Sequence, residues 1–210
     1  MAKGRGSEGG LGKIVLGFVL ALVVIALGAV VYFKWGSPPV ATADKPFPFE
    51  KQIVSVPLSA RIARQMKTPP FGTGEDVYEG GAKIYKADCA ECHGTPGHDV
   101  PYAKYMYPVA PQLWKKHAKG GVVGVSDDEA GETYWKVANG IRLSGMPGFS
   151  KSLSETQMWQ TALLLANADK LPESAKEALV TTTVTPTSPP GIVSPVPPPP
   201  AYPSSMPPPK

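Results

Sequence analysis

Residues 81–97 read GAKIYKADCAECHGTPG, and the interpretation of the whole chain starts from them. They hold the only two cysteines of the chain, Cys89 and Cys92, which are two residues apart and directly precede His93. This spacing is too short for a useful structural disulfide and suits a metal, redox or haem site instead. Residues 75–90, which run into the cysteine motif, repeat their apolar side chains with helical periodicity. We therefore expect a helix that leads directly into the motif.

The pattern Cys89-Ala-Glu-Cys92-His93 is typical of covalent haem attachment. Two thiols from one turn of chain bond to the two vinyl groups of haem, and the next residue places an imidazole beneath the iron as an axial ligand. A zinc site would need about two more soft ligands, and only His98 and His117 are left to supply them. A thioredoxin-like dithiol would follow a strand, whereas this motif follows an expected helix. The motif therefore predicts one covalent haem.

The second axial ligand has five candidates, which are Met106, Met146, Met158, His98 and His117. Met158 falls inside the expected last helix, where a core or surface methionine is the simpler interpretation. Met106 falls in the aromatic run 102–107, where packing against the haem edge or the surface is expected. Met146 lies in a loop between two helices and precedes Pro147, which stiffens that loop. Met146 is therefore favoured, with histidine ligation or an open sixth position as the alternatives.

The remaining signals between residues 74 and 170 are helical, and we predict an all-α fold. Ser126-Asp127-Asp128-Glu129 has the form of a capping box, and the helix that it opens would end at Asn139-Gly140. Residues 154–157 (SETQ) form a second capping box, which would open a helix over residues 155–168. Strand-like alternation is absent from this block of sequence.

The N-terminal part of the chain predicts a membrane anchor. Residues 14–33 (IVLGFVLALVVIALGAVVYF) contain no charge, and a helix of that length is about 30 Å long, enough to cross a bilayer. Lys3, Arg5 and Lys13 precede it, so we expect residues 1–13 in the cytoplasm, residues 14–35 as the anchor, and the rest outside. A signal peptide cleaved at residues 41–43 (ATA) is the alternative, but the apolar run is longer than usual for one.

Two proline-rich segments flank the expected haem domain at residues 74–170. In residues 36–73 the prolines should forbid long helices and give a linker that reaches up to about 100 Å. A short basic piece in it, 59–67, would be solvated or would dock on a partner or on lipid headgroups. Residues 171–210 should be a disordered tail, a spacer or a protein-binding ligand, since 12 of the last 30 residues are proline.

The net charge of +4 comes from the anchor and linker. Residues 1–73 hold nine basic and three acidic residues, whereas residues 74–170 hold ten and twelve. Membrane topology explains this excess of positive charge ahead of the domain. No arginine-rich or aromatic-interleaved patch accompanies it, so nucleic acid is excluded as a partner.

The order and spacing of these residues resemble a class I, mono-haem cytochrome c. The resemblance is closest to the small domains in the cytochrome c subunits of haem–copper oxidases and quinoprotein dehydrogenases. The matching residues are Gly81-x-x-x-Tyr85-x-x-x-Cys89-Ala-Glu-Cys92-His93-Gly94-x-x-Gly97, then Ala110-Pro111-x-Leu113, and then Asn139-Gly140-Ile-Arg142-Leu-Ser-Gly145-Met146-Pro147-x-Phe149. The loop Tyr102–Val109 departs from the shorter family loop and leaves the packing at the haem edge open.

The resemblance implies a class I cytochrome c fold around one covalent haem c. The implied cofactor-binding residues are Cys89, Cys92, His93, Pro111, Arg142 and Met146. His93 and Met146 would be the iron ligands, and His93 would donate its other ring N–H to a loop carbonyl. Arg142 would neutralise a haem propionate, with a solvated loop arginine as the alternative. Gly81 and Tyr85 would mark the crossing of the first and last helices, near Trp159.

The implied function is electron transfer rather than an enzymatic reaction. A membrane-anchored carrier would pass single electrons from a respiratory or photosynthetic donor, such as a quinol-oxidising complex or a dehydrogenase, to an acceptor such as a terminal oxidase. It could also be a subunit of a larger complex. Its haem domain would lie on the periplasmic side of the inner membrane. The alternative is a haem peroxidase or another haem enzyme subunit with an open sixth position, for which His98 would be the nearby base.

Overall fold

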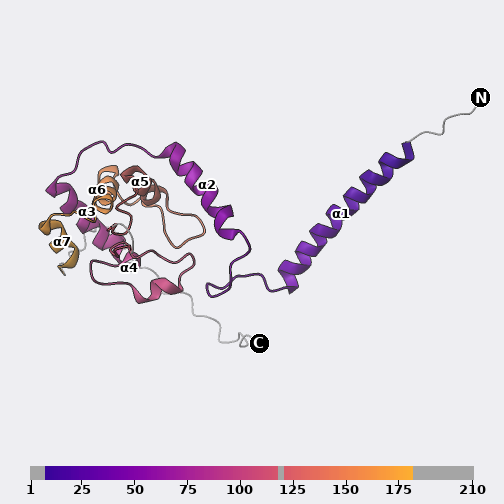
Figure 1. Ribbon diagram of the computed structural model, residues 1–210, viewed down its shortest axis with the longest axis horizontal. Helices are drawn as coiled ribbons and strands as arrows, with labels where there is room; N and C mark the ends of the chain where they lie inside the picture. The colour runs from indigo at the N-terminus through magenta and orange to yellow at the C-terminus, as the bar shows by residue number, and fades with distance from the viewer. Residues whose placement is uncertain (1–7, 118–120, 182–210) are drawn as a thin grey trace, which may run out of the picture.

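The computed structural model describes residues 8–117 and 121–181, and this part of the chain is helical (Figure 1). The helices are α1 (Glu8–Trp35), α2 (Glu50–Gln65), α3 (Glu75–Asp88), α4 (Ala90–His93), the 3-10 helix η1 (Pro101–Tyr105), α5 (Ala130–Asn139), α6 (Glu155–Ala166) and α7 (Glu173–Val180). Within these ranges the only β-type pairings are two isolated bridges, between Thr95 and His98 and between Lys116 and Val123. The predicted all-α fold is confirmed.

α1 lies apart from the other helices (Figure 1). Its residues Gly10–Trp35 form a helix that is long and apolar enough to cross a membrane, and none of it is buried against the rest of the protein. Lys34 lies over the Trp35 ring, 4.7 Å from the ring centroid, at the end nearer the domain. Aromatic and basic residues favour this position at a membrane surface.

The centre of the domain is the crossing of α3 and α6. A side chain at Gly81 would collide with the Gln160 carbonyl and with the Leu164 side chain, so only glycine permits the two backbones to approach this closely. Tyr85, one turn further along α3, is fully buried in the same core. The predicted crossing is therefore present, with Gln160 and Leu164 opposite Gly81 rather than Trp159.

The capping predictions for α5 and α6 had different outcomes. Ser154 caps α6 as predicted, because its side chain accepts from the Gln157 backbone while the Gln157 side chain accepts from the Ser154 backbone. The prediction that Ser126 opens α5 is wrong. The Ser126 hydroxyl instead accepts a hydrogen bond from the backbone of Val123, three residues earlier, so it closes a turn and α5 begins only at Ala130.

The predicted linker over residues 36–73 contains a long helix, so the expectation that its prolines forbid one is wrong. α2 runs for 16 residues through Pro57, whose ring lies exposed to solvent. Packing stabilises the helix: Ile62 is buried, and Trp135 Nε1 of α5 donates to Gln65 Oε1 at 3.0 Å. Tertiary contacts thus override the local penalty of the proline.

The predicted boundary at residue 170 is also too early. α7 packs on α3, and Leu171, Ala175 and Leu179 are buried in the same core as Tyr85. Ser174 Oγ donates to Glu75 Oε1 at 2.5 Å, which joins α7 to the first turn of α3. Residues 171–181 therefore belong to the domain, whereas the predicted disordered tail over 182–210 lies outside the described residues.

Candidate haem-binding site

The cysteine motif forms one tight turn between α3 and α4. The backbone N–H of Cys89 still bonds to the Tyr85 carbonyl, at 2.8 Å, and the N–H groups of Cys92 and His93 both bond to the Cys89 carbonyl. The Tyr85 hydroxyl donates to the Gly94 carbonyl at 2.8 Å and so joins α3 to the end of this turn. Both thiols and the imidazole are thereby held on one short segment of backbone.

The Cys89 thiol does not resemble the activated thiol of a redox-active dithiol. Burial raises its pKa to about 12, with a further contribution from the neighbouring Asp88. A reactive dithiol needs a lowered pKa, because the thiolate is the nucleophile. The two cysteines form no disulfide, and the described residues contain no group of three or more potential metal-binding side chains. This environment disfavours both the zinc and the thioredoxin-like alternatives.

The orientation of the His93 ring is set by one hydrogen bond. Its Nδ1 lies 2.8 Å from the carbonyl oxygen of Pro111, which can only accept. Nδ1 therefore carries the proton, and Nε2 is left as the atom with a free lone pair. The backbone N–H of Leu113 also bonds to the His93 carbonyl, at 3.1 Å. Segment 110–113 thus holds the histidine from two sides.

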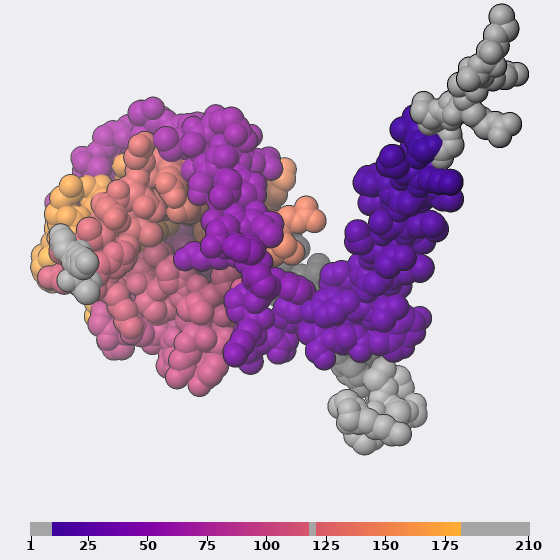
Figure 2. Space-filling view, turned by 45° about the vertical axis from the view of Figure 1, so that its right-hand side comes forward, coloured from indigo at the N-terminus to yellow at the C-terminus, as the bar shows by residue number. Residues whose placement is uncertain are grey.

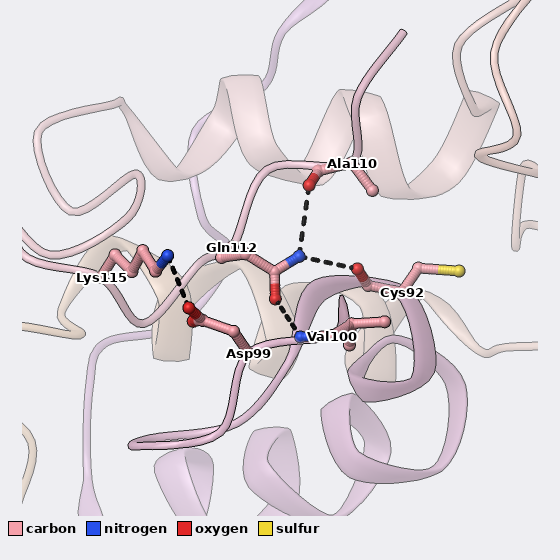
Figure 3. A network of polar contacts seen from close by, with 6 residues as sticks. All are labelled: Cys92, Asp99, Val100, Ala110, Gln112 and Lys115. Atoms are coloured by element: carbon pink, nitrogen blue, oxygen red, sulfur yellow. Dashed lines mark hydrogen bonds and ion pairs between the residues drawn. The ribbon is translucent and has the colours of Figure 1, made fainter. Parts of the chain in front are cut away.

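Gln112 fixes that segment in place (Figure 3). Its side-chain Nε2 donates to the carbonyls of Cys92, at 3.1 Å, and Ala110, at 3.2 Å, while its Oε1 accepts from the backbone of Val100 at 2.7 Å. A neighbouring ion pair joins Lys115 to Asp99 at 2.5 Å. The cysteine turn, the segment beside it and residue 100 are therefore connected through one amide side chain.

A large, mostly carbon-lined cavity lies beside the motif. It encloses about 1150 Å³ of atom-free space, including its open mouth. Most of its lining comes from five parts of the fold: the end of α3 with the turn of Cys89, Cys92 and His93, the segment 106–113, one face of α5, the loop 141–149, and part of α6. An apolar cleft of this kind suits a flat, largely apolar prosthetic group.

Met146 lines this cavity, and the loop that carries it is fastened to α5. The backbone N–H of Phe149 bonds to the Val137 carbonyl at 2.9 Å, and that of Ile141 bonds to the Met146 carbonyl at 3.2 Å. The Ser144 hydroxyl accepts from the Met146 backbone at 3.1 Å. Together with Pro147, these bonds restrict the loop, so that little entropy is lost when the thioether binds a partner.

Met106 lines the same cavity as Met146. A side chain at Gly145 would come within 2.9 Å of the Met106 methyl carbon, so the two loops touch at this point. Met158 is instead buried in the core of α5 and α6. His98 and His117 are exposed and lie outside the cavity lining. Of the five candidates for the second axial ligand, only Met106 and Met146 therefore face the same space as His93.

Two polar residues of α5 in the cavity lining were not anticipated from the sequence. The hydroxyl of Thr133 is buried and has no hydrogen-bond partner among the described residues. Lys136 lies one turn further along and forms ion pairs with Glu132, at 2.6 Å, and with Asp128, at 3.4 Å. The predicted end of this helix at Asn139-Gly140, from which the Met146 loop starts, could have identified both residues, because helical spacing places them on the face toward that loop.

Arg142 behaves differently from the other predicted site residues. Its side chain is exposed and does not line the cavity. The other predicted site residues all line it: Cys89, Cys92, His93, Pro111 and Met146. Its contact with a haem propionate therefore stays a prediction.

Residues 76–165 match the family model described as cytochrome C oxidase, cbb3-type, subunit III. This segment is a class I c-type cytochrome domain. No match was found among the curated proteins or the solved structures. The match runs from the first turn of α3 to the last turn of α6, so it covers the cysteine motif, the segment 110–113 and the Met146 loop.

A c-type cytochrome domain carries covalently bound haem c with its iron. The residues present fit that group. The cavity is apolar, two thiols lie on its wall, one imidazole has a free Nε2, and a thioether projects from a restrained loop. The buried Thr133 hydroxyl, which has no partner in the described parts of the chain, is available to a polar substituent of the group. A domain of this family indicates an electron carrier.

Proposed function

We propose that this protein is a membrane-anchored cytochrome that transfers single electrons between a respiratory or photosynthetic donor and an acceptor such as a terminal oxidase. The observation that carries this proposal is the shared cavity of His93 and Met146. One strong nitrogen ligand and one thioether leave no iron position for a substrate. The thioether and the apolar surroundings favour the ferrous state and raise the reduction potential.

Each residue of the site has a separate role in this proposal. Cys89 and Cys92 would hold the haem covalently through their sulfurs, and His93 Nε2 and the Met146 sulfur would bind its iron. The Pro111 carbonyl holds the His93 ring through Nδ1. When bound, the haem iron gains and loses one electron. The protein excludes water from it through the apolar lining and keeps both ligands in place, so that little rearrangement accompanies each transfer.

α1 supports the membrane part of the proposal. It has the length and composition of a single membrane span, and the basic residues ahead of it favour an N-terminus in the cytoplasm. The haem domain would then lie on the periplasmic side of the inner membrane. With α2 docked on the domain, only residues 36–49 remain as a tether between the domain and α1. Such a tether reaches roughly 45 Å at about 3 Å per residue, much less than an extended linker would.

The partners follow from the same features. The family's printed name is that of an oxidase subunit, so a haem–copper oxidase is the first acceptor to consider. A quinol-oxidising complex or a dehydrogenase would be the donor. The chain would act either as a carrier between them or as a fixed subunit of one. Residues 182–210 would serve as a spacer or as a protein-binding segment.

The enzyme alternative has less support. A peroxidase would need an open iron position with an acid–base residue above it. The residue that would have served, His98, lies in a shallow surface pocket with Asp99, outside the haem cavity.

A redox titration combined with carbon monoxide binding tests the proposal. The purified membrane protein should show one reversible one-electron transition, and its reduced form should not bind carbon monoxide readily. Rapid binding of carbon monoxide by the unmodified protein would contradict the carrier function and favour a haem enzyme. A mass spectrum should show a single haem adduct on the chain.

A further inference from the structure

The face of α2 that points away from the domain is apolar. Phe49 directly precedes the helix with a left-handed backbone (φ 64°), and its carbonyl accepts from the Ile53 backbone at 2.9 Å. Ile53 and Val56 are three residues apart and lie on one side of the helix. The side chains of Phe49, Ile53 and Val56 are 73%, 68% and 66% exposed. Single exposed apolar residues are ordinary, but an uncovered helical stripe of large ones indicates a binding surface. We call these three residues the outer stripe.

The opposite face of α2 packs against the haem domain. Leu58, Ile62 and Gln65 follow the spacing i, i+4, i+7, about half a turn of the helical wheel away from Ile53 and Val56. Ile62 is 4% exposed, and Gln65 accepts from Trp135 Nε1 of α5. Arg61 lies over the Trp135 ring, 6.0 Å from its centroid. The haem domain therefore covers one side of α2 and leaves the outer stripe facing outward.

Both ends of α2 are fastened, so the direction of the outer stripe is fixed relative to the haem cavity. At the first turn, Glu50 accepts from the Tyr107 hydroxyl through Oε1 and from the Phe47 backbone through Oε2, both at 2.8 Å. Tyr107 belongs to the segment beside Met106 and Pro108, which line the cavity. At the last turn, the bond between Gln65 and Trp135 holds the helix to α5.

The outer stripe lies next to the end of the proposed membrane span. The Phe47 ring packs edge-to-face on Tyr32 of α1, with 6.4 Å between the centroids. The chain between them thus returns to the level of the last turn of α1, where Trp35 also lies. Figure 1 shows α2 running across the direction of α1, on the side of the domain nearer to it. Figure 2 shows α2 on the outside of the domain.

The charge of this segment matches an anionic surface. Residues 45–67 hold five basic side chains, Lys45, Lys51, Arg61, Arg64 and Lys67, and one acidic side chain, Glu50. Glu50 is engaged by Tyr107 and the Phe47 backbone, Arg61 lies over Trp135, and Lys67 pairs with Glu155 at 3.6 Å. The basic side chains of this segment that have no ion pair and no aromatic contact among the described residues are therefore Lys45, Lys51 and Arg64. A basic helix with one apolar face, directly after a membrane span, has the composition of an interfacial helix on anionic lipid.

We propose that α2 is an interfacial helix, and that its outer stripe inserts among the headgroups of anionic phospholipids at the outer surface of the membrane. This inference rests on the proposed anchoring by α1 and goes beyond it. An anchor alone would let the haem domain rotate at the end of its tether. A second contact through α2 gives the domain one orientation on the bilayer, and therefore one direction for the mouth of the haem cavity.

Site-directed spin labelling of the full haem-loaded chain tests this directly. Ile53→Cys and Val56→Cys would each be labelled, since the native cysteines are taken up by the haem. The protein would be placed in nanodiscs of phosphatidylcholine and phosphatidylglycerol. Lys176→Cys on α7, across the domain from α2 in Figure 1, is the matched control. Collision rates would be measured with oxygen, which concentrates in lipid, and with a water-soluble nickel complex.

The oxygen-to-nickel ratio at residues 53 and 56 should exceed that at residue 176 several-fold. A ratio at residues 53 and 56 equal to that at residue 176 would show that the stripe faces water and would overturn the proposal. Protection from both reagents would also overturn it, since a protein surface rather than lipid would then cover the stripe. Alkaline carbonate extraction distinguishes a failure of the anchor from a failure of the α2 proposal. Release of the chain from membranes would contradict anchoring by α1. If the chain is retained, the label ratios alone decide whether α2 contacts lipid.

Discussion

The Nδ1 atom of His93 lies 2.8 Å from the carbonyl oxygen of Pro111, eighteen residues further along the chain. Because that oxygen can only accept, the contact selects the tautomer of the ring and turns Nε2 into the ligand atom. The carbonyl belongs to a loop rather than to a helix, so its position depends on whatever holds the loop. In this domain, that role falls to Gln112.

We predict that Gln112→Ala loosens the His93 support. The change removes three hydrogen bonds, two to the carbonyls of Cys92 and Ala110 and one from the Val100 backbone. The loss should be about 1–3 kcal/mol in the free energy of unfolding, measured by guanidinium denaturation with haem absorption as the signal. Gln112→Glu keeps the bond from Val100 but turns a carboxylate oxygen toward the carbonyls of Cys92 and Ala110, so it should destabilise the domain at least as much as alanine. Equal stability of all three proteins would show that the network has no such role.

Lys136 should influence the reduction potential. It lines the cavity as a cation, and its ion pairs with Glu132 and Asp128 balance two carboxylates nearby. Lys136→Gln removes the cation and leaves both carboxylates, which favours the more positive, oxidised haem. The midpoint potential should therefore fall by tens of millivolts, on a scale where about 59 mV is a tenfold change for one electron.

Lys151→Gln is the control for charge alone, because Lys151 is exposed and lies outside the cavity lining. Its potential should stay close to that of the wild type. An unchanged or higher potential in Lys136→Gln would mean that the lysine charge is fully screened from the haem.

Tyr85 should make the domain less stable at alkaline pH. Burial raises the pKa of its phenol well above the ordinary value of about 10. The folded state therefore keeps the proton above pH 10, whereas the unfolded chain releases it. The free energy of unfolding should fall as the pH rises beyond about 10, by up to about 1.4 kcal/mol per pH unit.

Tyr85→Phe isolates this effect. At neutral pH it should cost about 0.5–1.5 kcal/mol, because the hydrogen bond to the Gly94 carbonyl is lost. Above pH 10 its stability should fall less steeply than that of the wild type. Denaturant unfolding at several pH values measures both effects, and parallel curves for the two proteins above pH 10 would contradict the role of the buried phenol.

The sequence was most informative where short-range chemistry decides the outcome. The cysteine motif and the Ser154 cap depend on a few neighbouring residues, and the structure contains both. The helix crossing at Gly81 joins residues distant in sequence and was implied by the family resemblance. Ser126 was misjudged because a hydroxyl before acidic residues can close a turn as well as cap a helix.

The other errors come from contacts that are distant in sequence. α2 persists through Pro57 because it packs on α5, where Trp135 bonds to Gln65, seventy residues earlier in the chain. α7 belongs to the core because Ala175 and Leu179 pack against α3, although the sequence around them is unremarkable. Local patterns carry no information on such pairings. The exposed position of Arg142 is likewise a tertiary property.

In the proposed function, Met146 and not the nearby Met106 would bind the iron together with His93. The most direct measurement is the weak near-infrared band that a methionine–iron bond gives in the oxidised protein. Met146→Ala should abolish the band, lower the potential and let the reduced protein bind carbon monoxide, whereas the matched variant Met106→Ala should keep the band. A band that survives in Met146→Ala, or that disappears in Met106→Ala alone, would contradict ligation by Met146.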